Sequence, residues 1–186
     1  IAIEAASIAC GLVPGISRSF GFEKLLNFDR ELWTELREDA KSEVNLHREV
    51  SITASDISSI VVRKAEANAL RAGLGGLLES GNLKFSVCDA RNVLPPTETP
   101  GIIVANPPYG EQSTPRSATV GSMMRHVADN LKHNFAGWTA WMLTSDRHLP
   151  GEMHLKEGRK TVLFNGPLEC RFFKFDLVAG SNRRVK

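Results

Sequence analysis

Cysteine is scarce in this sequence, and the three that occur among its 186 residues, Cys10, Cys88 and Cys170, stand far apart. Zinc sites and disulfide frameworks need cysteines at short, paired spacings, so the sequence predicts neither. We interpret all three as reduced, buried thiols, which favours the cytoplasm as the compartment. The five histidines do not have the spacing of metal ligands either, and we therefore expect no metal site.

Long hydrophobic runs are also missing. The apolar start, Ile1 to Val13, is interrupted by Glu4 and has no basic region before it, so we interpret it as a core helix and not as a signal peptide. No run reaches the roughly 20 apolar residues that cross a bilayer, and we expect no membrane association. The sequence also lacks a large excess of one charge. Its net charge is +2, which permits a nucleic-acid partner without predicting one. With 42% apolar and 24% charged residues, the composition is that of one soluble globular domain.

The most informative stretch is Asn106-Pro107-Pro108-Tyr109, which follows the apolar run Gly101 to Ala105. Two prolines fix the backbone and remove two N–H donors, so nearby carbonyls stay available as acceptors. The Asn106 amide offers another acceptor, and the Tyr109 ring can stack on a planar base. The stretch suits the exocyclic amine of a nucleobase, although a proline-stiffened surface turn is the alternative interpretation.

From Glu49 onwards, short apolar strands alternate with helices, which predicts an α/β fold with a mostly parallel sheet. We expect strands at 50–54, 83–88, 101–105 and 138–143, and helices at 58–72 and 118–134. A closing antiparallel hairpin is expected from 161–164 and 171–177 around Asn165-Gly166-Pro167. Ser58 or Ser59 can cap the helix at 58–72, and Gly73 can end it. Before Glu49, a helical lead-in covers 1–48, with Asp29 capping an amphipathic helix near 30–43.

Polar residues follow three of the expected strands: Asp56, Asp89 and Asn106. Ligands of open α/β sheets bind at the carboxyl ends of strands, so these side chains should line one crevice. Asp56 suits a ribose, and Asp89 with the Ala90 backbone suits an adenine ring. Each aspartate can instead serve a turn or a helix cap, and the sequence leaves both interpretations open.

Four blocks resemble the bacterial large-subunit ribosomal RNA guanine-N2 methyltransferases, a family often described as N6-adenine-specific DNA methylases. They are IEAASIACGLVPGISRSFGFEKLLNFDRELW, SDISSIVVRKAEANALRAG, IIVANPPYGE and FNGPLECRFFKFDL. The resemblance implies the Rossmann-like class I methyltransferase fold, with a reversed last strand, and S-adenosylmethionine as the cofactor. It also implies that the cofactor is held by Asp56, Ile57, Asp89, Ala90 and Asn106, and that the target guanine is bound by the catalytic stretch Asn106, Pro107, Pro108 and Tyr109.

The resemblance also implies a first strand and a glycine-rich cofactor loop directly before Ile1. We therefore expect 1–186 to be a methyltransferase catalytic domain truncated at its N-terminus, with ribosomal RNA as its partner. A DNA adenine-N6 methyltransferase remains the alternative enzyme, since the same four residues serve adenine N6. A non-catalytic RNA-binding scaffold with the same fold is the alternative outside enzymes.

Overall fold

The computed structural model describes residues 1–108 and 117–179, and it divides the chain into two compact units, Ile1–Val87 (unit 1) and Cys88–Lys186 (unit 2). In the described part of the chain, no helix is long and apolar enough to cross a membrane. The same residues contain no group of three or more histidine, cysteine or acidic side chains that could hold a metal ion. Cys10 and Cys170 are buried, as expected, whereas Cys88 is half-buried.

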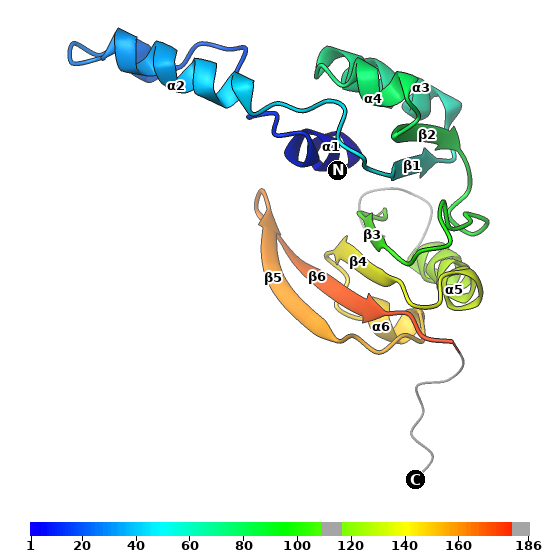
Figure 1. Cartoon of the computed structure of the whole chain (residues 1–186). Coiled ribbons are helices and arrows are strands. Elements are labelled where there is room, and N and C mark those ends of the chain that lie inside the picture. The colour runs from blue at the N-terminus through cyan, green and yellow to red at the C-terminus, as the bar shows by residue number, and fades with distance from the viewer. Residues whose placement is uncertain (109–116, 180–186) are drawn as a thin grey trace. The chain divides into compact units, whose positions relative to one another are not determined.

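Unit 1 contains a two-stranded parallel sheet, β1 (Ile52–Asp56) and β2 (Leu83–Val87), with the helices that connect and cover it (Figure 1). The helical elements are α1 (Ala2–Ala9), a short 3₁₀ helix (Gly21–Lys24), α2 (Arg30–Ser42), α3 (Ser59–Arg71) and α4 (Gly75–Glu79). Its core is formed by six fully buried side chains: Ala6, Cys10, Ala69, Leu74, Leu77 and Leu83. Helix α2 contributes no buried residue to this core.

The expected helix signals in unit 1 are confirmed. The Asp29 side chain accepts a hydrogen bond from the Leu32 amide at 2.9 Å and caps α2. Ser58 does the same for α3, accepting from the Val61 amide at 3.4 Å. Gly73 follows α3 with φ of +80°, a conformation that glycine adopts without the strain a Cβ causes. Polar caps therefore fix where both helices begin, and Gly73 marks where α3 ends.

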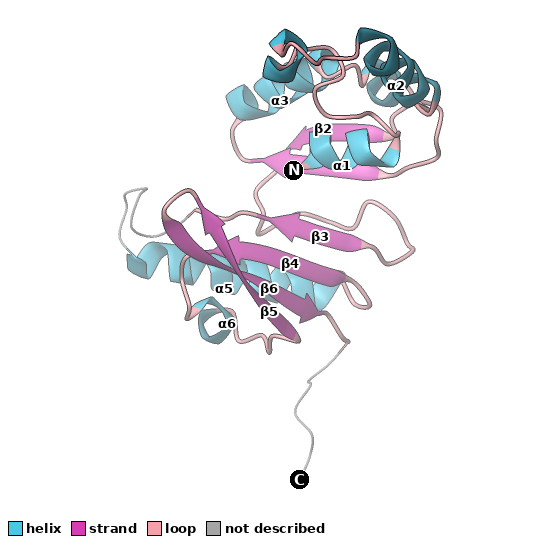
Figure 2. Ribbon diagram, turned by 90° about the vertical axis from the view of Figure 1, so that its left-hand side faces the viewer, coloured by secondary structure: helices cyan, strands magenta, loops and turns pink. Residues whose placement is uncertain are grey.

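Unit 2 is a four-stranded sheet with two helices packed on one of its faces (Figure 2). The strands are β3 (Ile102–Ala105), β4 (Thr139–Thr144), β5 (Arg159–Asn165) and β6 (Leu168–Asp176), in the order β3-β4-β6-β5. β3 and β4 run parallel, while β6 lies antiparallel to both β4 and β5. The expected mostly parallel arrangement with a reversed last strand is therefore confirmed.

The helices α5 (Ser117–Asn134) and α6 (Leu149–Glu152) cover the face of the sheet that carries Ala140, Met142 and Phe173. Buried α5 side chains, among them Met124 and Leu131, complete this core. On the opposite face, the rings of Trp141 and Phe172 stack with their centroids 4.8 Å apart. One face of the sheet is thus a packed core, and the other carries an aromatic pair.

Several strand boundaries differ from those expected. The first strand is Ile52–Asp56 and not 50–54, because the pairing begins where Ile52 meets Leu83. Asp56 is consequently the last residue of β1 and pairs with Val87. The second, third and fourth strands are each within one residue of expectation at either end. The hairpin is longer than expected, and Asn165 pairs with Leu168 across a tight turn at Gly166 and Pro167.

Gly11 provides a test of the packing in unit 1. Its φ is +72°, and a Cβ added there would lie 2.8 Å from the Glu43 carbonyl oxygen, at the end of α2. We expect Gly11→Ala to destabilise the chain by about 1–2 kcal/mol or more, since both the backbone conformation and the contact are unfavourable. Gly76→Ala is the matched control, because nothing lies within 4 Å of a Cβ in that helical position. The control should be neutral or stabilising in chemical denaturation, and equal effects of the two changes would contradict the packing described.

Candidate functional site

Asp56 and Ile57 lie at the carboxyl end of β1 in unit 1. The Asp56 carboxylate accepts a hydrogen bond from the Ser58 amide at 2.8 Å through Oδ1. Ser58, and not Asp56, is the residue that caps α3. Asp56 instead stabilises the turn before the helix, and this contact uses one of its two carboxylate oxygens. Ile57 follows with 68% of its surface exposed. A carboxylate beside an exposed apolar side chain offers both an acceptor for hydroxyl groups and a surface for a flat ring.

Asp89 follows β2 in the chain and is held by a residue that the sequence analysis did not single out. The Arg91 guanidinium forms an ion pair with the Asp89 carboxylate, with Nη2 2.5 Å from Oδ2 and Nε 3.0 Å from each oxygen. The Arg91 amide also donates to Oδ1 at 2.9 Å. These hydrogen bonds lower the pKa of Asp89 from 3.8 to about 2. The carboxylate is therefore ionised at any physiological pH. A hydrogen-bond donor of a ligand would have to share its oxygens with Arg91.

The loop around Ala90 is fixed from its other side by α5. The Asn130 side-chain amide donates to the Ala90 carbonyl at 3.4 Å and to the Val93 carbonyl at 2.8 Å. Among the described residues, no acceptor is recorded for the exposed Ala90 N–H. The loop therefore presents a backbone donor next to an ionised carboxylate, which is the pair that the sequence analysis proposed for an adenine ring. The Asp-x-Arg spacing is the only sequence signal that could have pointed to Arg91.

Asn106 directly follows β3, whose Ile103 and Ala105 pack against the α5 core. Pairing of Ala105 with Met142 fixes β3 parallel to β4, so Asn106 lies at the carboxyl edge of this sheet. Asn106 and Pro108 are exposed and Pro107 is half-buried. Tyr109 lies outside the described residues, so its predicted stacking role stays a prediction.

The carboxyl end of β4 carries polar residues that the sequence analysis missed. Thr144, its last residue, is buried, and its Oγ1 accepts from the Asp146 amide at 3.0 Å. Asp146 Oδ1 in turn accepts from the His148 amide at 2.8 Å. Beyond this loop, a cavity of about 480 Å³ is lined by Arg125, Arg147, His148, Pro150, Gly151, Glu152 and Glu157.

Glu152 has an unusual environment in this cavity. Burial raises its pKa, and the charge of Asp146 and a hydrogen bond with that side chain raise it further. The Glu152 carboxyl group also lies against α5, 3.0 Å from where a Cβ on Gly121 would be. The Arg125 Nε donates to the Glu152 carbonyl at 3.4 Å, and Lys132 Nζ donates to the Met153 carbonyl at 3.1 Å. Two cations of α5 thus satisfy the C-terminal carbonyls of α6.

The structure therefore groups the predicted residues by unit. Asp56 and Ile57 belong to unit 1, and Asp89, Ala90, Asn106, Pro107 and Pro108 belong to unit 2. Within unit 2, Ala90 and Asn106 are each connected to the same core, through Asn130 and through β3 respectively. A single crevice lined by all three strand ends stays a prediction.

Comparison with known proteins agrees with the resemblance read from the sequence. The profile of the UPF0020 family, described as an RMKL-like methyltransferase domain, matches residues 1–174. The ribosomal RNA large subunit methyltransferase K/L of Shewanella baltica is 38% identical over 99% of this chain, and that of Shewanella loihica is 38% identical over all of it. In both cases the chain spans 26% of the relative's length.

Solved structures show the same similarity. SMU.472, described as a methyltransferase in complex with SAH (S-adenosylhomocysteine), superposes with a TM-score of 0.84 and 26% identity. This superposition covers all of the chain and 46% of SMU.472. A predicted N6-adenine-specific DNA methylase from Listeria monocytogenes has a TM-score of 0.80 and 26% identity over 94% of the chain and 43% of its own length.

The raised pKa of Glu152 predicts a pH-dependent stability. A carboxyl group whose pKa is raised in the folded state stabilises that state while it is protonated, and the contribution is lost as the pH rises through the folded pKa. Glu152→Gln keeps the group neutral, so the variant should gain stability relative to wild type as the pH rises above about 4.5. Thermal unfolding measured from pH 4 to pH 8 checks this, with Glu157→Gln as the control in the same cavity. A stability difference between Glu152→Gln and wild type that is the same at every pH would contradict the role given to Glu152.

Proposed function

Because the chain belongs to the UPF0020 family of RMKL-like methyltransferase domains, we propose that it methylates an exocyclic amine of a nucleobase with S-adenosylmethionine as the cofactor. The proposed target is guanine N2 of large-subunit ribosomal RNA. The single observation that carries this proposal is the position of Asn106-Pro107-Pro108 at the carboxyl end of the parallel strand β3. The relatives named as ribosomal RNA methyltransferases support RNA as the substrate.

The amine-binding role follows from the acceptors of this stretch. An amino group conjugated to a purine ring is a poor nucleophile, because its lone pair is delocalised into the ring. Asn106 Oδ1 and the Pro107 carbonyl would accept hydrogen bonds from its two N–H groups and stabilise the positive charge that develops on nitrogen. Pro107 lacks an N–H and therefore cannot draw the chain into a competing hydrogen bond at that position. Tyr109 would hold the base by stacking after it leaves its helix.

The cofactor residues proposed are Asp56, Ile57, Asp89, Ala90 and Asn106. When bound, S-adenosylmethionine supplies a methyl group on a sulfonium that is already activated for transfer. The chain's contribution is then to bind and orient. Asp56 has one carboxylate oxygen beyond its contact with Ser58 to accept from the ribose hydroxyls, and Ile57 offers an exposed apolar surface for the adenine ring. The Ala90 N–H would donate to a ring nitrogen, while Asp89 would accept from the adenine amino group in competition with Arg91.

A DNA adenine-N6 methyltransferase is the second candidate, and the name of the Listeria protein favours it. The names of the Shewanella relatives, with their higher identity, favour RNA. A non-catalytic RNA-binding scaffold is the third candidate. A cytoplasmic location fits all three.

Methyl transfer from labelled S-adenosylmethionine separates these candidates. We would measure incorporation into large-subunit ribosomal RNA and into duplex DNA, using the chain and a hybrid in which it replaces the matched part of the S. baltica relative. Label in RNA supports the proposal, and label in DNA alone supports the second candidate. A correctly folded hybrid that binds RNA and transfers no label would favour the scaffold.

Asn106→Ala should lower turnover about 100-fold or more, because one preorganised transition-state contact is lost. The affinity for S-adenosylmethionine should fall much less. Turnover at saturating substrate and calorimetric binding of the cofactor measure the two effects separately. An equal loss in both would contradict the role given to Asn106.

Asp56→Asn should weaken S-adenosylmethionine binding by about ten-fold or more, since a charge-assisted hydrogen bond contributes roughly 1.5–3 kcal/mol. The amide retains an oxygen that can accept from the Ser58 N–H, so the turn should persist. Ser58→Ala is the structural control, because loss of the α3 cap should cost about 1 kcal/mol of stability without changing affinity. Unchanged binding in Asp56→Asn would refute the ribose assignment.

A further inference from the structure

Helix α2 and the segment before it form an apolar groove that neither the core nor the proposed function uses. The groove has a volume of about 260 Å³, and we call it the leucine groove. It is lined by Phe22, Leu25, Asn27, Phe28, Asp29, Leu32, Trp33 and Leu36. Figure 1 shows α2 apart from α1, α3 and α4 within unit 1.

An ordered aromatic cluster supports one wall of the leucine groove. The Trp33 ring meets Phe22 edge-on at 5.0 Å and Phe20 at 5.7 Å between centroids. Phe20 and Phe22 stack on each other at 5.3 Å. The Arg37 side chain is held on this side, because its Nη2 donates to the Ile16 carbonyl at 2.6 Å. One wall of the groove is therefore built from rings that pack against one another.

The open side of the leucine groove is unusually apolar. Leu25 is 59% exposed, and Leu32 and Leu36 are each 51% exposed. These residues share one surface with an indole, Trp33, whose Nε1 is buried without a hydrogen-bond partner among the described residues. A buried donor without an acceptor costs free energy. Clustered exposed leucines are typical of a surface that another molecule covers.

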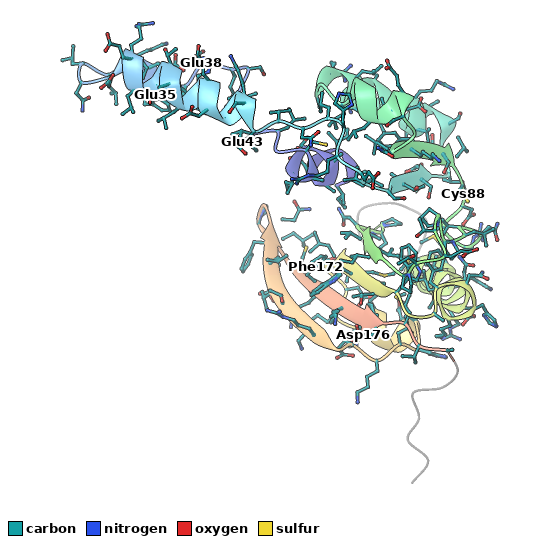
Figure 3. The ribbon with its side chains drawn as sticks, in the orientation of Figure 1. Glu35, Glu38, Glu43, Cys88, Phe172 and Asp176 are labelled. Atoms are coloured by element: carbon teal, nitrogen blue, oxygen red, sulfur yellow. The ribbon has the colours of Figure 1, made fainter. Side chains whose placement is uncertain are left out.

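A row of acidic residues runs beside these leucines. Glu31, Glu35, Asp39 and Glu43 repeat at four-residue spacing, and Glu31 and Glu35 directly precede Leu32 and Leu36. Figure 3 labels Glu35 and Glu43 along α2. None of the four belongs to an ion pair recorded for the described residues. Like charges at this spacing destabilise a helix by about 0.2–0.5 kcal/mol per pair, a cost that positive charges from a partner would reverse.

We propose that the leucine groove binds a basic amphipathic helix of a partner protein. The apolar side chains of that helix would enter the groove between Leu25, Leu32 and Leu36, in the manner of helices that dock into hydrophobic grooves. Its lysines or arginines would meet Glu35 and Asp39. The acidic row favours a basic protein segment over nucleic acid, because it repels phosphates. This interaction is separate from methyl transfer and would persist if the proposed activity were wrong.

The probe is a synthetic helical peptide with leucines at helical spacing and lysines between them, titrated into the full chain. The readout is the indole N–H signal of Trp33 in a ¹H–¹⁵N spectrum, assigned with Trp33→Phe, since Trp138 and Trp141 provide internal references. We expect a saturable shift of the Trp33 signal that weakens with salt. The same peptide with glutamates in place of lysines, and a ribosomal RNA fragment, should leave it unchanged.

Two variants separate specific docking from general attraction. Glu35→Lys with Asp39→Lys should weaken binding about ten-fold or more, since two exposed ion pairs are replaced by repulsion. The matched control is Glu79→Lys on α4, which should bind as wild type. Leu36→Ser should also weaken binding, whereas Leu70→Ser, at a leucine 60% exposed on α3, should not. Equal weakening by variant and control, a Trp33 shift caused by RNA, or self-association of the chain through α2 would each overturn the proposal.

Discussion

The parallel direction of β3 and β4 is the constraint on which the substrate side of the candidate site depends. Ala105 pairs with Met142, so β3 runs toward the same edge of the sheet as β4, which continues to Thr144, and the chain leaves the sheet at Asn106. The packing of Ile103 and Ala105 against α5 secures this direction, because a slip of one residue would turn both side chains away from the core. The two prolines then hold the backbone that follows in a narrow range of conformations. Strand pairing, core packing and proline geometry together present the acceptors of Asn106 and Pro107 at one edge.

The charged groups of the molecule are arranged by local contacts. Arg91 keeps Asp89 ionised through hydrogen bonds only two residues away, whereas burial and Asp146 favour the neutral form of Glu152. The first arrangement keeps an acceptor ionised in the proposed cofactor site, and the second accompanies the position of the Glu152 carboxyl group beside Gly121 of α5. On α2, by contrast, the acidic row has no cationic partner within the described part of the chain. The same chemical group is thus ionised and paired, shifted toward the neutral form and half-buried, or exposed without an ion pair, according to its neighbours.

Much of the fold could be predicted from the sequence, because the signals are local. Asp29, Ser58 and Gly73 mark helix ends through their own backbone contacts, and the Gly166-Pro167 turn marks the final hairpin. The start of β1 could not be placed correctly, since it depends on the pairing of Ile52 with Leu83 of β2, far along the chain. Arg91 and Glu152 were missed for a similar reason: their roles arise from contacts that no periodicity reveals. We expected α2 to be an amphipathic helix with one covered face. Only the exposed fractions of Leu32 and Leu36 in the structure show that its leucines are not covered.

In the proposed function, Asn106-Pro107-Pro108 receives a nucleobase amine, with guanine N2 as the amine. The most direct measurement is mass spectrometry of nucleosides from large-subunit ribosomal RNA after reaction with isotope-labelled S-adenosylmethionine and the S. baltica hybrid. We expect labelled N2-methylguanosine that disappears in Asn106→Ala. Label found only in N6-methyladenosine, or label in N2-methylguanosine that persists in Asn106→Ala, would contradict it.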